Sequence, residues 1–169
     1  LFDIDGTLIN TGGSGLQALK LAFIETFGRE PPAEIETAGR TDRGIARDLF
    51  SHHAIDDTLD NWIRFRTAYL KHLSEEMPPR QGYMLPGVAA LLADLSERDD
   101  VALGLLTGNV LEGAQIKLRH FGLDHHFRFG GYGEHHPERN AVAEAALQAA
   151  HRALNGCVQS EWVWVIGDT

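Results

Sequence analysis

The sequence predicts an α/β protein in which helices cover a parallel sheet and an all-helical segment is inserted after the first strand. Two observations support this prediction. From about residue 88 onward, apolar runs typical of strands alternate with stretches of helical periodicity. Such alternation implies parallel strands that are joined by helices. Between residues 10 and 82, in contrast, the sequence shows only helical patterns and loop signals.

The N-terminal half holds the first strand and the inserted segment. The strand comprises Leu1, Phe2 and Ile4, and Gly6-Thr7 ends it. A glycine-rich loop over residues 10–15 follows, and then helices are expected over 16–27, 41–53 and 56–76, with Gly28, Pro31-Pro32 and Pro78-Pro79 as breaks. Thr41 or Asp42 caps the second of these helices. The expected apolar side of the third consists of Leu59, Trp62, Ile63, Tyr69, Leu70 and Leu73.

The C-terminal half contains the alternating elements. Helices are expected over residues 88–95, 111–121 and 140–154, and strands over 101–106, 127–129 and 162–166. Ligands of open parallel sheets bind beyond the carboxyl ends of the strands. The polar groups at those ends are Asp3 and Asp5, Thr107-Gly108-Asn109, and Gly167-Asp168-Thr169. Helices follow the first two groups, and helix N-termini favour anions. The layout therefore indicates a site that handles phosphate.

The composition and net charge of the chain argue against several kinds of binding partner. The net charge of −9 over 169 residues argues against nucleic acid and against an anionic membrane surface. No apolar run approaches the roughly 20 residues of a membrane span. The single cysteine, Cys157, precludes an internal disulfide and fits a reducing, cytoplasmic compartment. The absence of an initiator Met and the last residues, which directly follow an apolar strand, suggest that both ends are cut.

The string Asp3-Ile4-Asp5-Gly6-Thr7-Leu8 carries the most specific signal. Carboxylates two residues apart on a strand lie on the same side and can aim at one point. A bare Asp-x-Asp would more often be a strand that ends in an Asx-type turn. The full string resembles the nucleophile motif of the haloacid dehalogenase (HAD) superfamily. This resemblance implies a HAD fold, with a Rossmann-like parallel sheet as its core.

The resemblance also implies roles for individual residues. Asp3 matches the nucleophile, which forms an aspartyl-phosphate, and Asp5 matches the general acid-base. Thr107 matches the second motif, in which the hydroxyl and the following amides bind a phosphoryl oxygen; a helix cap or ST-turn is the simpler alternative for this residue. The implied substrate-binding residues are Gly6, Thr7, Gly108, Asn109 and Arg40.

A metal site is implied as well. Gly167-Asp168 matches the fourth motif, whose acidic residue helps to hold Mg²⁺. The cation offsets the repulsion between an anionic nucleophile and an anionic phosphate. Mg²⁺ prefers hard oxygen ligands, which here would be Asp3, Asp168 and the main-chain carbonyl of Asp5.

The chain departs from the family pattern at two motifs. Where the third motif usually has a lysine, this chain has Glu138-Arg139-Asn140, and we expect Arg139 to supply the cation. Lys117 is a poorer candidate because it falls inside a helix. The remainder of the fourth motif, beyond Thr169, is missing from this chain, which leaves weak metal binding or an incomplete enzyme as alternatives.

The inserted helical block resembles the C1 cap of the phosphoglycolate phosphatase-like branch. The expected domains are a cap over residues 10–82 and a core over 1–9 and 83–169, with the C-terminal part of the core missing. The crossings near residues 10–15 and 81–86 would act as hinges for a cap that excludes water. Arg40, in the loop over residues 38–42, would bind a second anionic group of the substrate. A solvated arginine in a capping loop is an equally good interpretation.

The expected function is that of a Mg²⁺-dependent phosphatase that hydrolyses a small soluble phosphate monoester, similar to phosphoglycolate, through an aspartyl-phosphate. The alternatives are a sugar-phosphate mutase of the same fold and a weakly active binding or regulatory protein. The expected partner is a small phosphorylated metabolite. The sequence leaves open whether the protein forms a homodimer.

Overall fold

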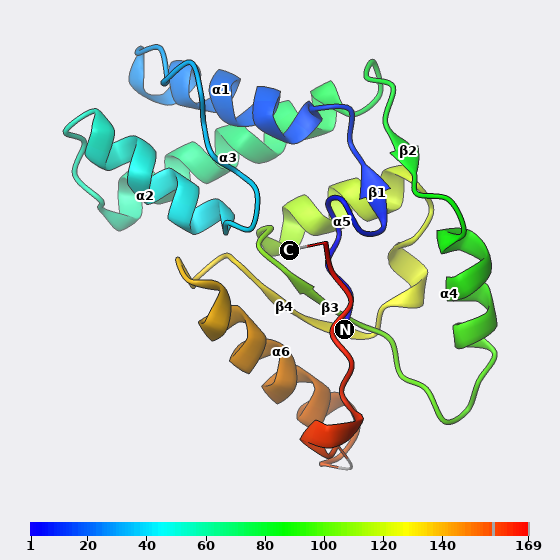
Figure 1. Cartoon of the computed structure of the whole chain (residues 1–169). Helices are drawn as coiled ribbons and strands as arrows, with labels where there is room; N and C mark the ends of the chain where they lie inside the picture. Colours follow the sequence, from blue (N-terminus) through cyan, green and yellow to red (C-terminus); the bar gives the residue numbers. More distant parts are fainter. Residues whose placement is uncertain (157, 169) are drawn as a thin grey trace.

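The parallel sheet is built around two regular strands, as the computed structural model shows (Figure 1). Strand β3 (Gly104–Thr107) pairs in parallel with β4 (Phe129–Tyr132), with Gly104 opposite Phe129. On the other side of β3, Phe2 forms parallel bridges to Leu105 and to Ile166. The amide of Phe2 donates to the carbonyl of Gly104 at 2.9 Å. All residues of β3 are buried, as expected for a parallel strand that is covered on both faces.

Helices α4 (Val88–Ser96), α5 (Leu111–His120) and α6 (Arg139–Ala153) accompany the sheet. Helix α6 packs against β4 at close range because Gly131 has no side chain: a Cβ there would collide with the carbonyl of Val142. The core of this part is a cluster that includes Phe2, Ile4, Leu8, Ile9, Val88, Leu92, Leu103, Leu105, Ala114, Leu118 and Leu123. The α/β class with a parallel sheet is thereby confirmed.

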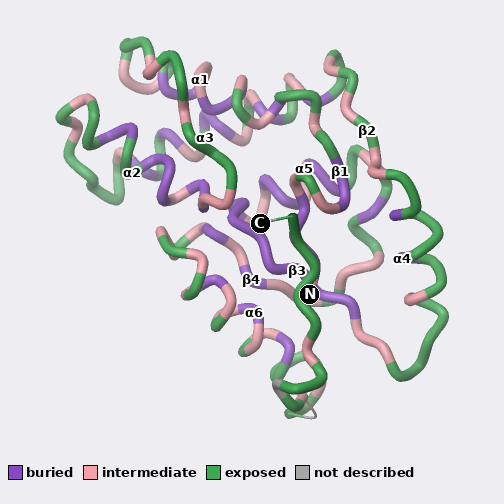
Figure 2. The backbone as a smooth tube through the Cα atoms, viewed as in Figure 1, coloured by how far each residue is buried: buried purple, intermediate pink, exposed green. Residues whose placement is uncertain are grey.

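The inserted helices are α1 (Ser14–Phe27), α2 (Asp42–His52) and α3 (Leu59–Glu76). They surround a separate apolar cluster in which Phe23, Phe27, Phe50 and Phe65 contact one another. Figure 2 shows buried residues on the sides of α1, α2 and α3 that face one another. The chain enters and leaves this block through β1 (Ile9–Asn10) and β2 (Tyr83–Met84), which pair antiparallel. The division into core and cap at residues 10–82 stays a prediction.

The expected apolar side of α3 was partly wrong. The buried residues of this helix are Trp62, Phe65, Ala68, Tyr69 and Leu73. Leu59 and Ile63 are 74% and 49% exposed, because they lie on a flank of the helix beside this stripe. The helix begins at Leu59 rather than at residue 56, since the hydroxyl of Thr58 caps it by accepting the amide of Asn61.

The last expected strand, over residues 162–166, is also largely wrong. Ser160–Trp162 forms a 3-10 turn, and only Ile166 bridges to the sheet. Trp162 and Trp164 are exposed. Figure 1 shows the first residues of the chain beside the C-terminal segment, where the amino group of Leu1 donates to the carbonyl of Trp164 at 2.6 Å.

The structure describes residues 1–156 and 158–168. Cys157 and Thr169, on which expectations were placed above, lie outside the described residues. Within the described ranges, no helix combines the length and the apolar character needed to cross a membrane.

Candidate active site

A cavity of about 400 Å³ lies between the carboxyl edge of the sheet and the inserted helices. It gathers nearly all residues that the sequence singled out: Asp3, Asp5, Gly6, Arg40, Thr107, Gly108, Asn109, Arg139 and Asp168. Lys117 and Asp42 line the same cavity. Thr7 does not line it; its hydroxyl lies 3.5 Å from an Asp168 carboxylate oxygen, next to the cavity wall.

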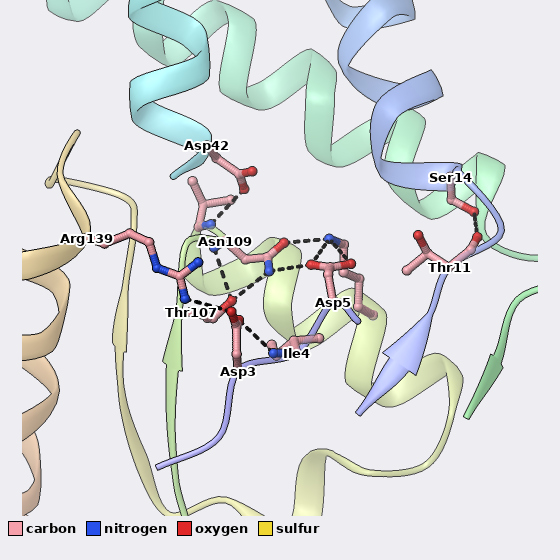
Figure 3. A network of polar contacts seen from close by, with 11 residues as sticks. Asp3, Ile4, Asp5, Thr11, Ser14, Asp42, Thr107, Asn109 and Arg139 are labelled. Atoms are coloured by element: carbon pink, nitrogen blue, oxygen red, sulfur yellow. Dashed lines mark hydrogen bonds and ion pairs between the residues drawn. The ribbon is translucent and has the colours of Figure 1, made fainter. Parts of the chain in front are cut away.

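Asp3 presents its carboxylate from the end of the first strand segment. The residue is 7% exposed, and Oδ1 accepts a hydrogen bond of 2.7 Å from the amide of Ile4. Arg139, the first residue of α6, places Nη2 2.8 Å from Asp3 Oδ2 (Figure 3). The guanidinium group of Arg139 therefore forms a direct ion pair with this buried carboxylate.

Thr107 ends β3 and is fully buried. Its hydroxyl oxygen accepts from the amide of Asn109 at 3.3 Å and from Asn109 Nδ2 at 2.8 Å. As an acceptor in these contacts, the hydroxyl keeps its own proton to donate. Asn109 Nδ2 also donates to Asp5 Oδ2 at 2.8 Å, so one amide group connects Thr107 with Asp5 (Figure 3).

Lys117, which the sequence made only the poorer candidate for the cation of the site, contacts Asp5 in the structure. Its Nζ lies 2.9 and 2.7 Å from the two carboxylate oxygens of Asp5 and 2.6 Å from Asn109 Oδ1. The residue is only 4% exposed. Lys117 thus contacts Asp5, whereas Arg139 contacts Asp3. A signal was available: Lys117 shares the buried face of α5 with Gly113, Ala114 and Leu118, and a lysine on the apolar side of a helix needs a partner.

These contacts determine the charge of Asp5. Burial raises the pKa of this carboxyl, but the Lys117 ammonium and the hydrogen bonds from Lys117 and Asn109 outweigh it, so the pKa lies below its ordinary value. With no substrate bound, Asp5 is therefore a carboxylate.

The loop before α2 docks on the loop after β3. The amide of Asp42 donates to the carbonyl of Gly108 at 2.8 Å, and the amide of Val110 donates to Asp42 Oδ2 at 2.8 Å. Thr41 is the helix cap; its hydroxyl accepts from Gly44 and also donates to the carbonyl of Pro137 at 3.0 Å. Gly108 permits this approach, since a Cβ there would collide with the carbonyl of Arg40.

Arg40 reaches the cavity wall but is already paired. Its Nη2 lies 2.5 Å from Asp48 Oδ2, and its side chain is 32% exposed. Asp48 lies on the exposed side of α2, so this ion pair is half in solvent and contributes little to stability. An incoming anionic group could therefore replace Asp48 at low cost.

The docked Asp42 carboxylate makes the stability of the fold depend on pH. Burial raises the pKa of Asp42 to about 6, although the Lys117 ammonium and the Val110 amide oppose this rise. Because the folded pKa exceeds the unfolded one, the folded protein holds the proton more tightly. Ionisation of Asp42 therefore lowers stability as pH rises from about 4 to about 6, by ~3 kcal/mol in total.

We expect Asp42→Asn to remove this penalty while keeping an oxygen for the Val110 amide. The free energy of unfolding of the variant, relative to the unmodified protein, should rise by ~3 kcal/mol between pH 4 and pH 7. Urea unfolding at several pH values measures it. Asp94→Asn, at an exposed position of α4, is the matched control. A relative stability that stays constant with pH would contradict the buried, ionisable Asp42.

The donor types at the cavity fit a hard cation. Asp3 and Asp168 both line it, and the Asp168 carboxylate lies so close over Gly6 that a Cβ there would overlap it. Carboxylate and main-chain oxygens are ligands that Mg²⁺ accepts. Among residues 1–156 and 158–168, however, no three or more His, Cys, Asp or Glu side chains gather as a metal cluster. Metal binding by Asp3, Asp5 and Asp168 stays a prediction.

Solved structures share this fold. CbbY from Rhodobacter sphaeroides, crystallised in complex with phosphate, is 21% identical, with a TM-score of 0.71 over 97% of this chain and 74% of that chain. A predicted phosphatase from Clostridium acetobutylicum is 16% identical, with a TM-score of 0.65 over 97% and 72%. A predicted phosphoglycolate phosphatase from Haemophilus somnus 129pt is 20% identical, with a TM-score of 0.56 over 81% of this chain; the match spans 63% of that chain.

The family model of haloacid dehalogenase-like hydrolases matches residues 1–169. This match covers the whole chain, and it includes the motif residues that line the cavity. The chain therefore belongs to the family of haloacid dehalogenase-like hydrolases.

Proposed function

We propose that this protein is a phosphatase that hydrolyses a small phosphate monoester through an aspartyl-phosphate on Asp3. The observation that carries the proposal is the buried Asp3 carboxylate, which lines the cavity and is held by the Ile4 amide and by Arg139 at 2.8 Å. An isolated buried ion pair is a weak source of stability. Its place beside Thr107 and Asp5, in a family of hydrolases, favours a catalytic role.

The reaction would begin with attack by an Asp3 oxygen on phosphorus. Thr107 would donate its remaining hydroxyl proton to a phosphoryl oxygen, together with the amides of Gly108 and Asn109. Arg139 would balance the negative charge that Asp3 and the phosphoryl group bring together. Asp5, a carboxylate before substrate binds, would take a proton from the phosphate monoanion of the bound ester and pass it to the leaving oxygen. It would then accept a proton from the water that cleaves the aspartyl-phosphate.

Magnesium is part of the proposal. Asp3, Asp168 and the main-chain carbonyl of Asp5 would hold the ion, whose charge would offset the repulsion between carboxylate and phosphate. Gly6 supports this arrangement, because it lets the Asp168 carboxylate come down against the turn that follows Asp5.

The proposed substrate is small and carries a second anionic group, as phosphoglycolate does. The cavity of about 400 Å³ suits a small metabolite. Arg40, at the cavity wall, would exchange Asp48 for a substrate carboxylate. The similarity in fold to a predicted phosphoglycolate phosphatase is consistent with this choice.

Phosphate release from a panel of small phosphate esters, including phosphoglycolate and a hexose phosphate, tests the proposal. We expect release in the presence of Mg²⁺, its loss on chelation with EDTA, and its return when Mg²⁺ is added in excess. Chromatography of the hexose phosphate reports isomerisation in the same samples.

Each other outcome has a clear meaning. Isomerised hexose phosphate without released phosphate would replace the phosphatase by a mutase. Release that is unaffected by EDTA would remove the metal from the proposal. An absence of any turnover across the panel would favour a binding or regulatory protein.

A further inference from the structure

Lys117 and Asp5 form an ion pair of the cavity in which the cation is almost fully enclosed. The Lys117 side chain is 5% exposed, whereas that of Asp5 is 44% exposed. A Cβ on Gly15, in the first turn of α1, would lie 3.6 Å from Lys117 Nζ. The ammonium group is thus covered on one side by the first turn of α1, while its side chain comes from α5.

The three protons of Lys117 have three acceptors within 2.9 Å: both carboxylate oxygens of Asp5, and Asn109 Oδ1. Asn109 in turn donates to Asp5 Oδ2 and to Thr107. Both Asp5 oxygens are therefore held from the side of α5, while the carboxylate stays open to the cavity. A carboxylate held in this way cannot rotate freely about its last side-chain bond.

We propose that Lys117 is a positioning residue that holds the carboxyl group of Asp5 in the orientation for proton transfer to the leaving oxygen. The inference rests on the proposed function, because it concerns the same reaction. It assigns the cations that contact Asp3 and Asp5 to different tasks: Arg139 serves the nucleophile and the phosphoryl group, and Lys117 serves the proton-transfer group.

The step in question is the first one. When an Asp3 oxygen bonds to phosphorus, the bond from phosphorus to the leaving oxygen breaks and its electron pair stays on that oxygen. An alkoxide needs the Asp5 proton at this moment, whereas the weakly basic p-nitrophenolate leaves without one. A residue that orients Asp5 therefore matters for alkyl phosphates and hardly for p-nitrophenyl phosphate.

Lys117→Met tests the inference on two substrates: the alkyl phosphate with the highest kcat/KM in the panel, and p-nitrophenyl phosphate. The ratio kcat/KM is the proper readout, because it reports the steps up to the departure of the leaving group. We expect a loss of roughly 10²-fold or more for the alkyl phosphate. The loss for p-nitrophenyl phosphate should be only a few-fold. Lys71→Met, on the exposed side of α3, is the matched control.

A double-mutant cycle adds an independent readout. In an Asp5→Asn background, Lys117→Met should cause almost no further loss, since the two residues act in one step. The double variant also buries no unpaired carboxylate. If Lys117→Met alone does not fold, Lys117→Gln replaces it; because its amide can still donate to Asp5, we expect a smaller loss that is again larger for the alkyl phosphate than for p-nitrophenyl phosphate.

Equal losses on both substrates would overturn the inference and assign Lys117 to charge stabilisation or to folding alone. Unchanged kcat/KM values, or additive losses in the cycle, would overturn it too. An unmodified protein that releases phosphate from neither substrate would refute the proposed function instead, so the two failures are distinguishable.

Discussion

Asp3→Asn is expected to lower phosphate release by roughly 10³-fold or more, to the background of the preparation. The amide oxygen that replaces the carboxylate is a poor nucleophile and cannot form an acyl-phosphate in the same way. The fold should survive, because Oδ1 of the new side chain can still accept the Ile4 amide. The local cost falls on Arg139, which loses its carboxylate partner.

The measurement combines kinetics with trapping. We compare kcat/KM for the best phosphate ester between the unmodified protein and the variant. In a second experiment, each protein reacts with an ester that carries a labelled phosphate, the reaction is quenched with acid, and the label bound to the protein is measured. We expect label on the unmodified chain and none on the variant. Circular dichroism and thermal unfolding establish that both are folded, and Asp99→Asn, at an exposed position, is the control.

Asp3→Ala guards against deamidation of the new asparagine back to aspartate. Substantial phosphate release by both Asp3→Asn and Asp3→Ala, in contaminant-free preparations, would rule out an aspartyl-phosphate on Asp3.

Arg139→Ala should cost two or more orders of magnitude in kcat. Its Nη2 lies 2.8 Å from the Asp3 oxygen that Ile4 does not engage, which is the position from which it can balance charge as the nucleophile meets the phosphoryl group. The effect should fall on kcat more than on KM, because the charge to be balanced is greatest in the transition state.

Arg139→Lys is the informative companion variant. It keeps the charge but loses the planar fork, so we expect it to recover part of the lost rate. Arg128→Ala, outside this cavity, controls for the general loss of one positive charge. A near-normal rate for Arg139→Ala would show that another cation, with Lys117 as the first candidate, stabilises the reaction.

The sequence was sufficient for features that depend on local order. Helical and strand periodicities are properties of adjacent residues, so α1, α4 and α5 appear close to their expected ranges, and the parallel α/β class is confirmed. Polar residues at strand ends could likewise be expected to meet, because parallel strands end at one edge. Asp3, Thr107 and Asp168 do line the same cavity.

Local patterns were insufficient where packing decides. Gly130 and Gly131 have no side chains that would mark a strand in the sequence. The sequence therefore predicted a strand over residues 127–129, whereas β4 covers Phe129–Tyr132. Leu59 and Ile63 of α3 have the character of core residues, but the cluster on which the helix packs lies to one side of them.

The pairing of charges was decided by the tertiary structure alone. Asp5 and Lys117 are 112 positions apart, and Asp3 and Arg139 are 136 apart. Nothing local to Lys117 states which carboxylate it will meet, nor that the loop at Asp42 will be buried against Gly108 and Val110. The sequence by itself determined which chemical groups gather at the edge of the sheet. Only the packing of α5, α6 and the inserted helices decided which cation holds which carboxylate, because this packing sets which side chains come within contact distance of each other.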